Sequence, residues 1–296
     1  MSEKFKQNTA IVTGASSQIG YFLCPRLLKA GFEVIALSRQ SHLYNDGISW
    51  KTLDLQKDTI ELTNPSVLFH AAPLPLLPNL LARLPINTHL QRVIAFSSTS
   101  VFTKADSSDF KERNVINELI KAESAFIPEC EKRQIQWTLF RPTLIYGCGR
   151  DKNVTFIINF IRRFGFFPIL GHGNGLRQPV HAEDLAIACL QAYESSITYC
   201  KDYQLSGGET LTYRKMVETI FQQLGKNPRI IRIPVRIFSL LVKVLHYLPA
   251  FSHINSAMIK RINQDLCFDH SEATQDFGYN PRRFNISNTF FSKQFS

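Results

Sequence analysis

The amino-acid sequence predicts an α/β fold organised around a doubly wound parallel sheet of the Rossmann type. The first observation is the stretch 9–20, TAIVTGASSQIG, which joins a short apolar strand to a helix through a turn of small residues. The second is an apolar strand at 33–37, which completes a strand-helix-strand unit of the expected length. The third is a series of further buried strands at 66–72, 91–96 and 137–140. Such alternation is typical of a parallel sheet with helices on both faces.

The turn after the first strand has the composition of a dinucleotide-binding loop. Gly14 allows a sharp turn, Gly20 allows the helix to pack closely on the strand, and the free N–H groups of the helix would meet a pyrophosphate. Ser17 stands where a G-x-x-G-x-x-G spacing would have its middle glycine, so the motif alone is weak. The strand-helix-strand context strengthens it, and we expect a cofactor site here, with the helix beginning at Gly20.

The end of the second strand distinguishes between the two nicotinamide dinucleotides. Ser38 and Arg39 occupy the place where an acidic residue would hold the ribose 2′-hydroxyl of NAD. A guanidinium suits a 2′-phosphate, so we expect NADP as the cofactor and NAD as the second choice. The alternative for Arg39 is an ordinary exposed cation in a loop.

Two later strand ends are expected near the adenine and its ribose. Asp54 stands near the end of a short strand at 50–55, and His70, Ala71 and Ala72 end the strand at 66–72, just before Pro73. Asp54 could equally be a turn acid or a helix cap, and the His70 ring could be a satisfied histidine packed under the loop. The proline-rich stretch that follows, 73–85, is either a kinked helical segment or an apolar loop.

The best candidate for an active-site edge is the end of the strand at 91–96. It finishes in four consecutive hydroxyl residues, 97–100, which would lie at the carboxyl end of a central strand. A long helical pattern at 109–134 and another strand at 137–140 follow. We therefore expect a substrate or nicotinamide to lie against these hydroxyls.

Composition and charge narrow the class of partner. The chain has 296 residues, 44% hydrophobic and 20% charged, which is typical of a globular protein with a large core. Its net charge of +10 favours anionic partners, but no contiguous basic tract or nucleic-acid motif is present, so we expect a phosphate-bearing small molecule and no nucleic acid. The six scattered cysteines predict reduced thiols and no metal site. The first residues show no secretory apolar core, which predicts a cytoplasmic location.

Six motifs in a fixed order carry a resemblance to a known family. They are TGxxxxIG, HAA, SSTSVF, RPTLIYG, GHGNGLRQPVHAEDLA and YQLSGGETLTYRKM. In this order and spacing the chain resembles the extended short-chain dehydrogenase/reductases, also called the NAD-dependent epimerase/dehydratase family, over nearly its whole length. The resemblance implies an NAD(P)-binding Rossmann domain, here 1–147 and 178–204. It also implies a smaller, discontinuous C-terminal domain that binds a nucleotide sugar or a related substrate, here 148–177 and 205–296.

The resemblance also assigns roles to single residues. Ser98 matches the family's Ser/Thr that hydrogen-bonds the reacting substrate oxygen, and 142–145 match the segment that lines the nicotinamide. Arg177 and His181 match the stretch where the family contacts substrate phosphate. Asp184, in the same stretch, is expected to cap the following helix.

The family's Tyr-x-x-x-Lys pair is missing from this chain. In that pattern the tyrosine transfers the hydroxyl proton, while the lysine one helical turn later lowers the pKa of the tyrosine and holds the nicotinamide ribose. Counting back from Arg141 aligns Glu123 with the glutamate that follows the pair. That register puts Val115 and Leu119 at the positions of the tyrosine and the lysine.

Other residues are candidates to transfer the proton instead. A register shifted by two residues would bring Asn117 and Lys121 to the positions of the pair, but it requires an indel inside a packed helix. Ser98 and Thr99 could relay a proton, and Tyr146 could approach from the next strand, although a structural ring on the core wall is the preferred interpretation of Tyr146.

The second half of the chain carries features expected on the substrate side. The polar loop 147–153 contains Arg150, Lys152 and Asn153, and with Arg177 its cations could clamp a diphosphate. The apolar stretch 233–249 is too short and too charged to span a bilayer. It is expected to be a helix packed on the substrate domain, and the alternative is an interfacial helix that makes peripheral contact with an anionic membrane.

These interpretations predict an NADP-binding nucleotide-sugar epimerase or reductase with a non-standard active site, acting as a monomer or homodimer. The alternative is a non-catalytic NAD(P)-binding regulatory or structural subunit. The predicted catalytic residues are Ser98 and Thr99, and the predicted substrate contacts are Arg150, Asn153, Arg177 and His181. The predicted cofactor contacts are Gly14, Ser16, Ser17, Gln18, Ile19, Gly20, Ser38, Arg39, Asp54, Leu55, His70, Ala71, Ala72, Pro73, Ser97, Pro142, Thr143, Leu144 and Ile145.

Overall fold

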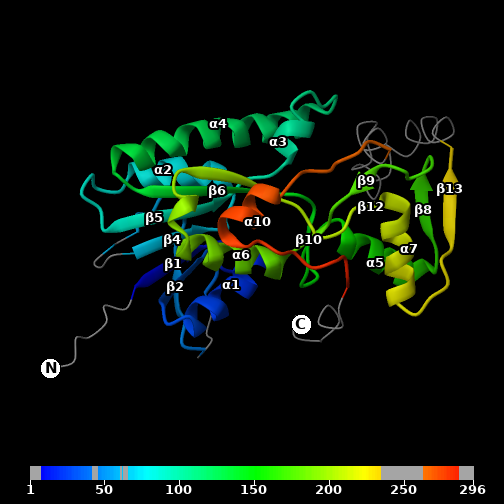
Figure 1. The fold of residues 1–296 in the computed structure, drawn as a ribbon, viewed down its shortest axis with the longest axis horizontal. Coiled ribbons are helices and arrows are strands. Elements are labelled where there is room, and N and C mark those ends of the chain that lie inside the picture. The colour runs from blue at the N-terminus through cyan, green and yellow to red at the C-terminus, as the bar shows by residue number, and fades with distance from the viewer. Residues whose placement is uncertain (1–7, 42–45, 61, 63–65, 235–262, 287–296) are drawn as a thin grey trace.

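The computed structural model describes residues 8–41, 46–60, 62, 66–234 and 263–286. Figure 1 shows a larger part on the left, built on a sheet flanked by helices, and a smaller part on the right that contains α5 and α7. The chain passes between the two parts more than once, so segments far apart in the sequence meet where the parts join.

The larger part contains a seven-stranded sheet in the order β11-β6-β5-β4-β1-β2-β3, and every neighbouring pair is parallel. This is the doubly wound α/β arrangement that the sequence predicts, so the prediction of fold class is confirmed. The strands are β1 Thr9–Thr13, β2 Glu33–Ser38, β3 Ser49–Thr52, β4 Ser66–His70, β5 Leu90–Phe96, β6 Gln136–Pro142 and β11 Lys201–Leu205.

Helices cover both faces of the sheet. One face packs against α1 Gln18–Lys29, α6 Ala182–Glu194 and α10 Ser271–Phe277. The other packs against α2 Leu77–Ala82 and α4 Phe110–Lys132, with the short turn η1 Leu74–Leu76 beside them. Because β1 and β4 are buried along their whole length, they are apolar on both faces, as parallel strands between two helical layers must be.

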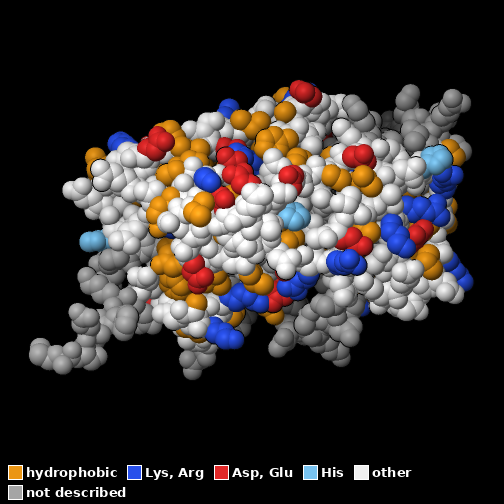
Figure 2. Space-filling view, viewed as in Figure 1, with side chains coloured by type: hydrophobic (Ala, Val, Ile, Leu, Met, Phe, Trp, Pro, Cys, Tyr) orange, Lys and Arg blue, Asp and Glu red, His pale blue; other side chains and the backbone are white. Residues whose placement is uncertain are grey.

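The smaller part has a core of its own. It is formed by α5 Val154–Phe164, α7 Tyr213–Gln223 and the parallel pair β8 Phe167–Leu170 and β13 Ile230–Ile233. The remaining elements are two short strand pairs, β7 Ile145–Tyr146 with β10 Val180–His181 and β9 Leu176–Arg177 with β12 Leu211–Thr212, and two short helical turns, α3 Ser100–Thr103 and η2 Ser196–Thr198. Figure 2 shows Lys and Arg side chains gathered over α7 and β13, at the right-hand end of the molecule.

The last described segment returns to the larger part, which differs from the sequence-based assignment of 205–296 to the substrate domain. Ala273, Phe277 and Tyr279 belong to the core beside α1 and α6, whereas Phe284 and Ile286 belong to the smaller core. The last described segment therefore packs against both parts of the molecule. No local sequence pattern predicts that residues after 270 complete the core of the larger part, because the residues that α10 contacts lie far away in the sequence.

Two helix starts differ from the prediction for identifiable reasons. α1 begins at Gln18 and not at Gly20, because the Ser17 side chain caps the helix by accepting a hydrogen bond from Gly20 N at 3.1 Å. Such a cap contributes about 1 kcal/mol. α6 is capped by His181 and not by Asp184, which lies inside the first turn. There its carboxylate accepts hydrogen bonds from Arg282 Nε at 2.7 Å and from Arg282 N at 3.0 Å.

Two other expectations concern the proline-rich stretch and the apolar stretch near the C-terminus. The stretch 73–85 is a kinked helical segment, made of η1 and α2. Of the expected helix at 233–249, everything after residue 234 lies outside the described residues. Among the described helices, none has the length and apolarity needed to cross a bilayer.

Candidate active site

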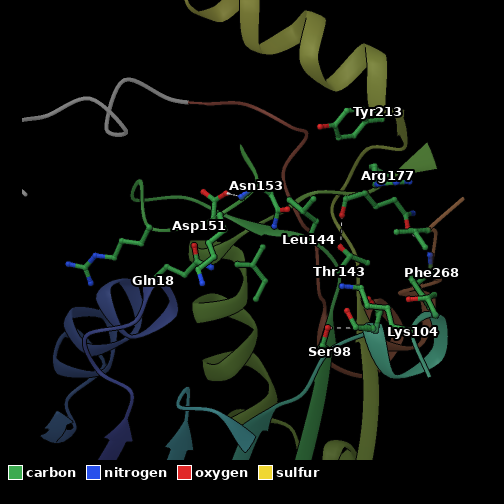
Figure 3. Close-up of a pocket in the computed structure, with 18 residues that line it drawn as sticks. Gln18, Ser98, Lys104, Thr143, Leu144, Asp151, Asn153, Arg177, Tyr213 and Phe268 are labelled. Atoms are coloured by element: carbon green, nitrogen blue, oxygen red, sulfur yellow. Dashed lines mark hydrogen bonds between the residues drawn. The ribbon is translucent and has the colours of Figure 1, made fainter. Parts of the chain in front are cut away.

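Two cavities lie along the carboxyl edge of the sheet, on either side of the β1–α1 turn. The first, of about 410 Å³, is lined by residues between 14 and 76. The second, of about 640 Å³, lies over the end of β5 and is lined by residues between 18 and 268 (Figure 3). Ser16 and Ser17 line the first cavity and Gln18 lines the second, so one turn separates them.

The β1–α1 turn is tight because its glycines touch backbone. Gly14 has φ +65°, and a Cβ atom there would lie 2.5 Å from Ala72 N. A Cβ atom at Gly20 would lie 2.4 Å from Ala15 O. Both contacts are too close for any larger residue, so the two glycines are required by close backbone approach, as the sequence predicts. Ser17 has φ −70°, a conformation that needs no glycine.

The turn and the first cavity fit a dinucleotide. The first turn of α1 carries no acidic side chain, and its leading amides have no intrahelical acceptor, which makes it a suitable cradle for a pyrophosphate. Ser38, Asp54, Leu55, Ala71, Ala72 and Pro73 line the first cavity together with the turn, and Arg39 lies exposed at its rim. The residues predicted to surround the adenosine half are therefore brought together, with His70 as the exception.

His70 contacts the backbone of the loop at Pro73 from inside the core and does not line the cavity. Its side chain is fully buried, its Nε2 lies 3.2 Å from Pro73 O, and its Nδ1 lies 2.8 Å from Thr13 Oγ1. Burial lowers the pKa of His70 to about 4. Because a carbonyl can only accept, the neutral ring carries its proton on Nε2 and accepts the Thr13 hydroxyl proton on Nδ1. His70 is thus the satisfied histidine of the second interpretation.

Asp54 combines its two proposed roles. It lines the first cavity, and its Oδ1 accepts a hydrogen bond from Gln56 N at 3.0 Å, which makes it a turn acid. Ser38 holds the neighbouring loop in a similar way, since its Oγ accepts a hydrogen bond from Gln40 N at 3.1 Å. Both side chains stabilise the rim from which Arg39 projects.

The second cavity has the predicted hydroxyls at its floor. Ser98 Oγ accepts a hydrogen bond from Ser100 N at 3.1 Å, so its own proton can still be donated to a ligand. Thr99 is buried and donates its hydroxyl proton to Pro142 O at 3.1 Å. Ser97 pairs with Glu123 on α4 and does not line the cavity. Of Ser97, Ser98 and Thr99, Ser98 is therefore the hydroxyl best able to bind a substrate oxygen.

The α4 helix presents no acid or base to this cavity among the described residues. Glu123 faces the end of β6, where it binds Arg141 Nη2 at 2.7 Å, and this contact fixes the rotation of the helix. Leu119 and Val115 lie one and two turns earlier on the same face, whereas Lys121 points to solvent and pairs with Glu118 at 3.1 Å. The replacement of the family's tyrosine and lysine by Val115 and Leu119 stays a prediction.

Tyr146 and His181 are buried behind the cavity wall. The Tyr146 ring is fully buried and its Oη accepts a hydrogen bond from Asn285 N at 3.2 Å, while burial raises the pKa of the phenol to about 12. The His181 ring packs on the rings of Phe22 and Tyr146, and its Nδ1 accepts a hydrogen bond from Glu183 N at 3.2 Å. Burial lowers the pKa of His181 to about 4. Neither ring lines the cavity, so the predicted substrate contact of His181 has no support in the geometry.

The loop after β7 closes the cavity on the side of the cofactor turn. Arg150 donates a hydrogen bond to Ser16 O and so connects this loop to the β1–α1 turn. Gly147, Cys148 and Gly149 all have positive φ, of 126°, 45° and 68°. Asp151, Lys152 and Asn153 continue the lining on this side, as Figure 3 shows for Asp151 and Asn153. Arg150 therefore bridges the two cavities instead of standing alone as an anion clamp.

The far end of the cavity carries a buried arginine and a tyrosine. Arg177 is 6% exposed, donates hydrogen bonds to Leu176 O and Gln264 O at 2.7 and 2.8 Å, and lies 5.9 Å from the centre of the Tyr213 ring. Burial raises the pKa of Tyr213 to about 12, and the Arg177 charge acts in the opposite direction. In Figure 3 both side chains lie across the cavity from Ser98. This end offers a cation and a hydroxyl to a polar ligand.

Lys104 is a lining residue that the sequence analysis missed. Its backbone N–H donates to Ser100 O at 3.0 Å, which holds it close to the Ser98 turn, and its ammonium lies 2.9 Å from Glu112 Oε1. Figure 3 labels Lys104 at the same lower edge as Ser98. The missed lining residues also include Gln178, Tyr213 and Phe268. The one sequence signal that could have predicted a role for Lys104 is its position two residues after the SSTSVF motif.

The structure brings most of the predicted site residues to the two cavities. Of those predicted, Thr143, Leu144, Ile145, Arg150, Asn153 and Arg177 line the second cavity with Ser98 and Thr99. Six others are in the supporting layer and line neither cavity: Ile19, Gly20, His70, Ser97, Pro142 and His181. All six cysteines are unpaired, and the described residues contain no cluster of three or more metal-ligating side chains.

In a comparison with known proteins, the segment that lines the first cavity matches a family. Residues 10–76 match the NAD dependent epimerase/dehydratase family. The chain is 26% identical to the uncharacterized protein y4nG of Sinorhizobium fredii, over 94% of this chain and 76% of that protein. It is also 26% identical to the mitochondrial NADH dehydrogenase (ubiquinone) 1 alpha subcomplex subunit 9 of Arabidopsis thaliana, over 49% of this chain and 39% of that subunit.

Solved structures share the fold over nearly the whole chain. MoeE5 in complex with UDP-glucuronic acid and NAD is 18% identical, with a TM-score of 0.69 over 94% of this chain and 95% of that chain. UDP-glucuronic acid 4-epimerase from Bacillus cereus in complex with NAD is 15% identical, with a TM-score of 0.70 over 95% and 93%. The family match confirms the resemblance to the NAD-dependent epimerase/dehydratase family over residues 10–76, and the solved structures show that the chain shares their fold.

Proposed function

We propose that this protein is an NAD(P)-dependent epimerase or reductase that acts on a nucleotide sugar. The observation that carries the proposal is the pair of cavities that meet at the β1–α1 turn, one shaped by backbone and one with Ser98 at its floor. The family match over residues 10–76 supports a dinucleotide in the first cavity. The bound UDP-sugars and NAD of the structural neighbours support the assignment of the second.

The cofactor proposed for this chain is NADP in preference to NAD. Arg39 lies at the rim of the first cavity, where the ribose 2′-position of the adenosine half would come, and no acidic residue stands beside it at the end of β2. The structural neighbours contain NAD, so Arg39 is the feature that would separate this chain from them.

In the proposed reaction, the groups near Ser98 act on a carbinol or carbonyl oxygen. NAD(P), when bound, supplies the hydride acceptor or donor. Ser98 donates its hydroxyl proton to the substrate oxygen and polarises the bond to carbon. Lys104, oriented by Glu112, gives or takes the proton of that oxygen, and it replaces the missing tyrosine as the proton-transfer group. Arg177 and Tyr213 hold the nucleotide end of the substrate at the far side of the cavity.

The test is turnover on a panel of UDP- and other nucleotide sugars, measured as NADPH oxidation and as sugar interconversion, with NADPH and NADH titrations in parallel. We expect slow turnover in the wild type and at least a further 10²-fold loss in Ser98→Ala, because a positioned proton donor contributes about 10² to 10⁴ in rate. The NADPH affinity should be the same in both proteins. Fast turnover that survives Ser98→Ala would refute the mechanism.

A second candidate function is a non-catalytic NAD(P)-binding subunit. It is favoured by the absence of a Tyr-x-x-x-Lys pair between residues 45 and 145, and by the predicted register that puts the aliphatic Val115 and Leu119 at the positions of that pair. The relative named as a subunit of NADH dehydrogenase is in keeping with it. Tight NADPH binding with no turnover on any sugar of the panel, in the wild type as in Ser98→Ala, would establish this second function and exclude the first.

A further inference from the structure

A third cavity lies at the opposite edge of the sheet, away from both cavities of the active site. It has a volume of about 210 Å³ and is lined by Asn8, Ser66, Gln91, Arg92, Tyr193 and Tyr199. Arg92 stands near the start of β5, and Ser98 lies just beyond the end of the same strand. At about 3.3 Å per residue the two are roughly 20 Å apart, so a ligand here would not touch the active site.

Arg92 is a buried cation with unused donors. Only 4% of its surface is exposed. Its Nη2 donates to Thr138 Oγ1 and Ala192 O, both at 3.0 Å, and to Thr198 Oγ1. Its Nε and Nη1 are buried and have no acceptor among the described residues. The guanidinium lies 4.1 Å from the centre of the Tyr199 ring, which covers one of its faces.

No described carboxylate neutralises this cation. The ion pairs of the described residues do not include Arg92. Burial lowers the pKa of Arg92. A buried guanidinium without a counter-charge costs several kcal/mol, which an anion in the adjoining cavity would offset.

The other polar groups around this cavity are also able to donate. Ser66 Oγ is buried and has no partner among the described residues. Tyr193 Oη accepts a hydrogen bond from Asn8 Nδ2 at 2.8 Å, so the tyrosine keeps its own proton for a ligand. Gln91 adds a side-chain amide. A cation, two hydroxyls and two amides around one cavity form a set that suits an oxygen-rich anion.

We infer that this cavity binds a small oxyanion, a phosphate or a short carboxylate, through Arg92, Ser66 and Tyr193. Its volume would hold about seven water molecules, so the ligand is a small ion and not a nucleotide. The bound anion would lie against the Arg92 guanidinium, whose buried Nε and Nη1 would turn toward the cavity to pair with it, while Nη2 keeps its contacts to Thr138, Ala192 and Thr198. The inference is independent of the proposed function, because none of these residues lines the active-site cavities.

The experiment is a titration of the full chain with sodium phosphate, sodium acetate or sodium chloride at matched ionic strength, with saturating NADPH present so that the cofactor turn is covered. Binding is followed by calorimetry and by the unfolding temperature. The variants are Arg92→Met and Ser66→Ala, and the matched control is Arg150→Met, an arginine that lines the active site. Phosphate and acetate as separate arms identify the kind of oxyanion.

We expect phosphate or acetate, but not chloride, to bind the wild type and Arg150→Met equally. Arg92→Met should weaken this binding about 10- to 100-fold, and Ser66→Ala about tenfold with no change of unfolding temperature in chloride. If Arg92→Met does not fold, Ser66→Ala decides. Equal responses to all three salts, unchanged binding in Ser66→Ala, or loss of binding only in Arg150→Met would each overturn the inference.

Discussion

The two active-site cavities are built in different ways, although one turn separates them. The first is lined by residues between 14 and 76 and owes its shape to backbone: two glycines in contact with neighbouring peptides, and strand ends made of small residues. The second is lined by side chains from segments between 18 and 268. The family match covers 10–76, which is the span of the first cavity. The proposed dinucleotide site thus coincides with the family match, whereas the second cavity draws on segments outside that match.

The largest effect is expected where the first cavity depends on backbone contact. Gly20→Val should abolish NADPH binding, because the new side chain would begin 2.4 Å from Ala15 O and push α1 away from the turn. Ser17→Gly is the matched control. It removes only a cap, and a glycine at that position costs a few tenths of a kcal/mol, so binding should persist. The measurement is a fluorescence titration, with circular dichroism to check the fold. Normal NADPH binding by a folded Gly20→Val protein would put the cofactor elsewhere.

The second cavity should respond to a single side chain. On the substrate that the panel identifies, Lys104→Met should lower kcat about 10²-fold and leave NADPH affinity unchanged, since Lys104 lines the cavity with Ser98 and is the proposed proton-transfer group. Lys152→Met, another lysine that lines the same cavity, is the control and should retain most activity. Steady-state kinetics at several pH values measure both. Equal rates in the two variants would remove Lys104 from the mechanism.

At the rim of the first cavity, one side chain, Arg39, is expected to set the preference between NADPH and NADH. Arg39→Ala should weaken NADPH binding about 10- to 100-fold and leave NADH binding nearly unchanged, because only NADPH carries the 2′-phosphate. Parallel titrations of both nucleotides on wild type and variant test this. If the wild type binds the two nucleotides equally, Arg39 is an ordinary surface cation.

The smallest effect concerns the two buried histidines behind the cavities. The pKa values of His70 and His181 are lowered to about 4, below their ordinary value near 6.5. As the pH falls below about 6.5 the unfolded chain takes up protons first, so stability is lost between pH 6.5 and 4. The loss should be at most about 1.4 kcal/mol per pH unit for each histidine.

Urea unfolding at pH 7 and pH 5 measures this loss. His70→Gln should reduce the pH dependence, because an amide keeps a donor for Pro73 O without titrating. A pH dependence that is the same in His70→Gln and in the wild type would show that His70 titrates normally in the folded state.

The sequence predicts elements whose causes are local and misses those whose causes are distant. The order of strands and helices, the glycine turn and the Ser98 floor follow from periodicity and from short motifs. The role of Asp184 does not, because its partner Arg282 lies 98 residues further on. Lys104 was missed for the same reason, since it matters only when α3, α5 and β9 meet around one cavity.

The return of α10 to the sheet also has a consequence for biosynthesis. Phe277 packs on Phe140 and Tyr203, so the hydrophobic layer over β6 and β11 is incomplete until residues near the end of the chain have left the ribosome. At a synthesis rate of about 5 to 20 residues per second, the stretch between β11 and α10 takes about 3 to 13 s to emerge. During that interval Phe140 and Tyr203 lack the ring that covers them in the folded protein.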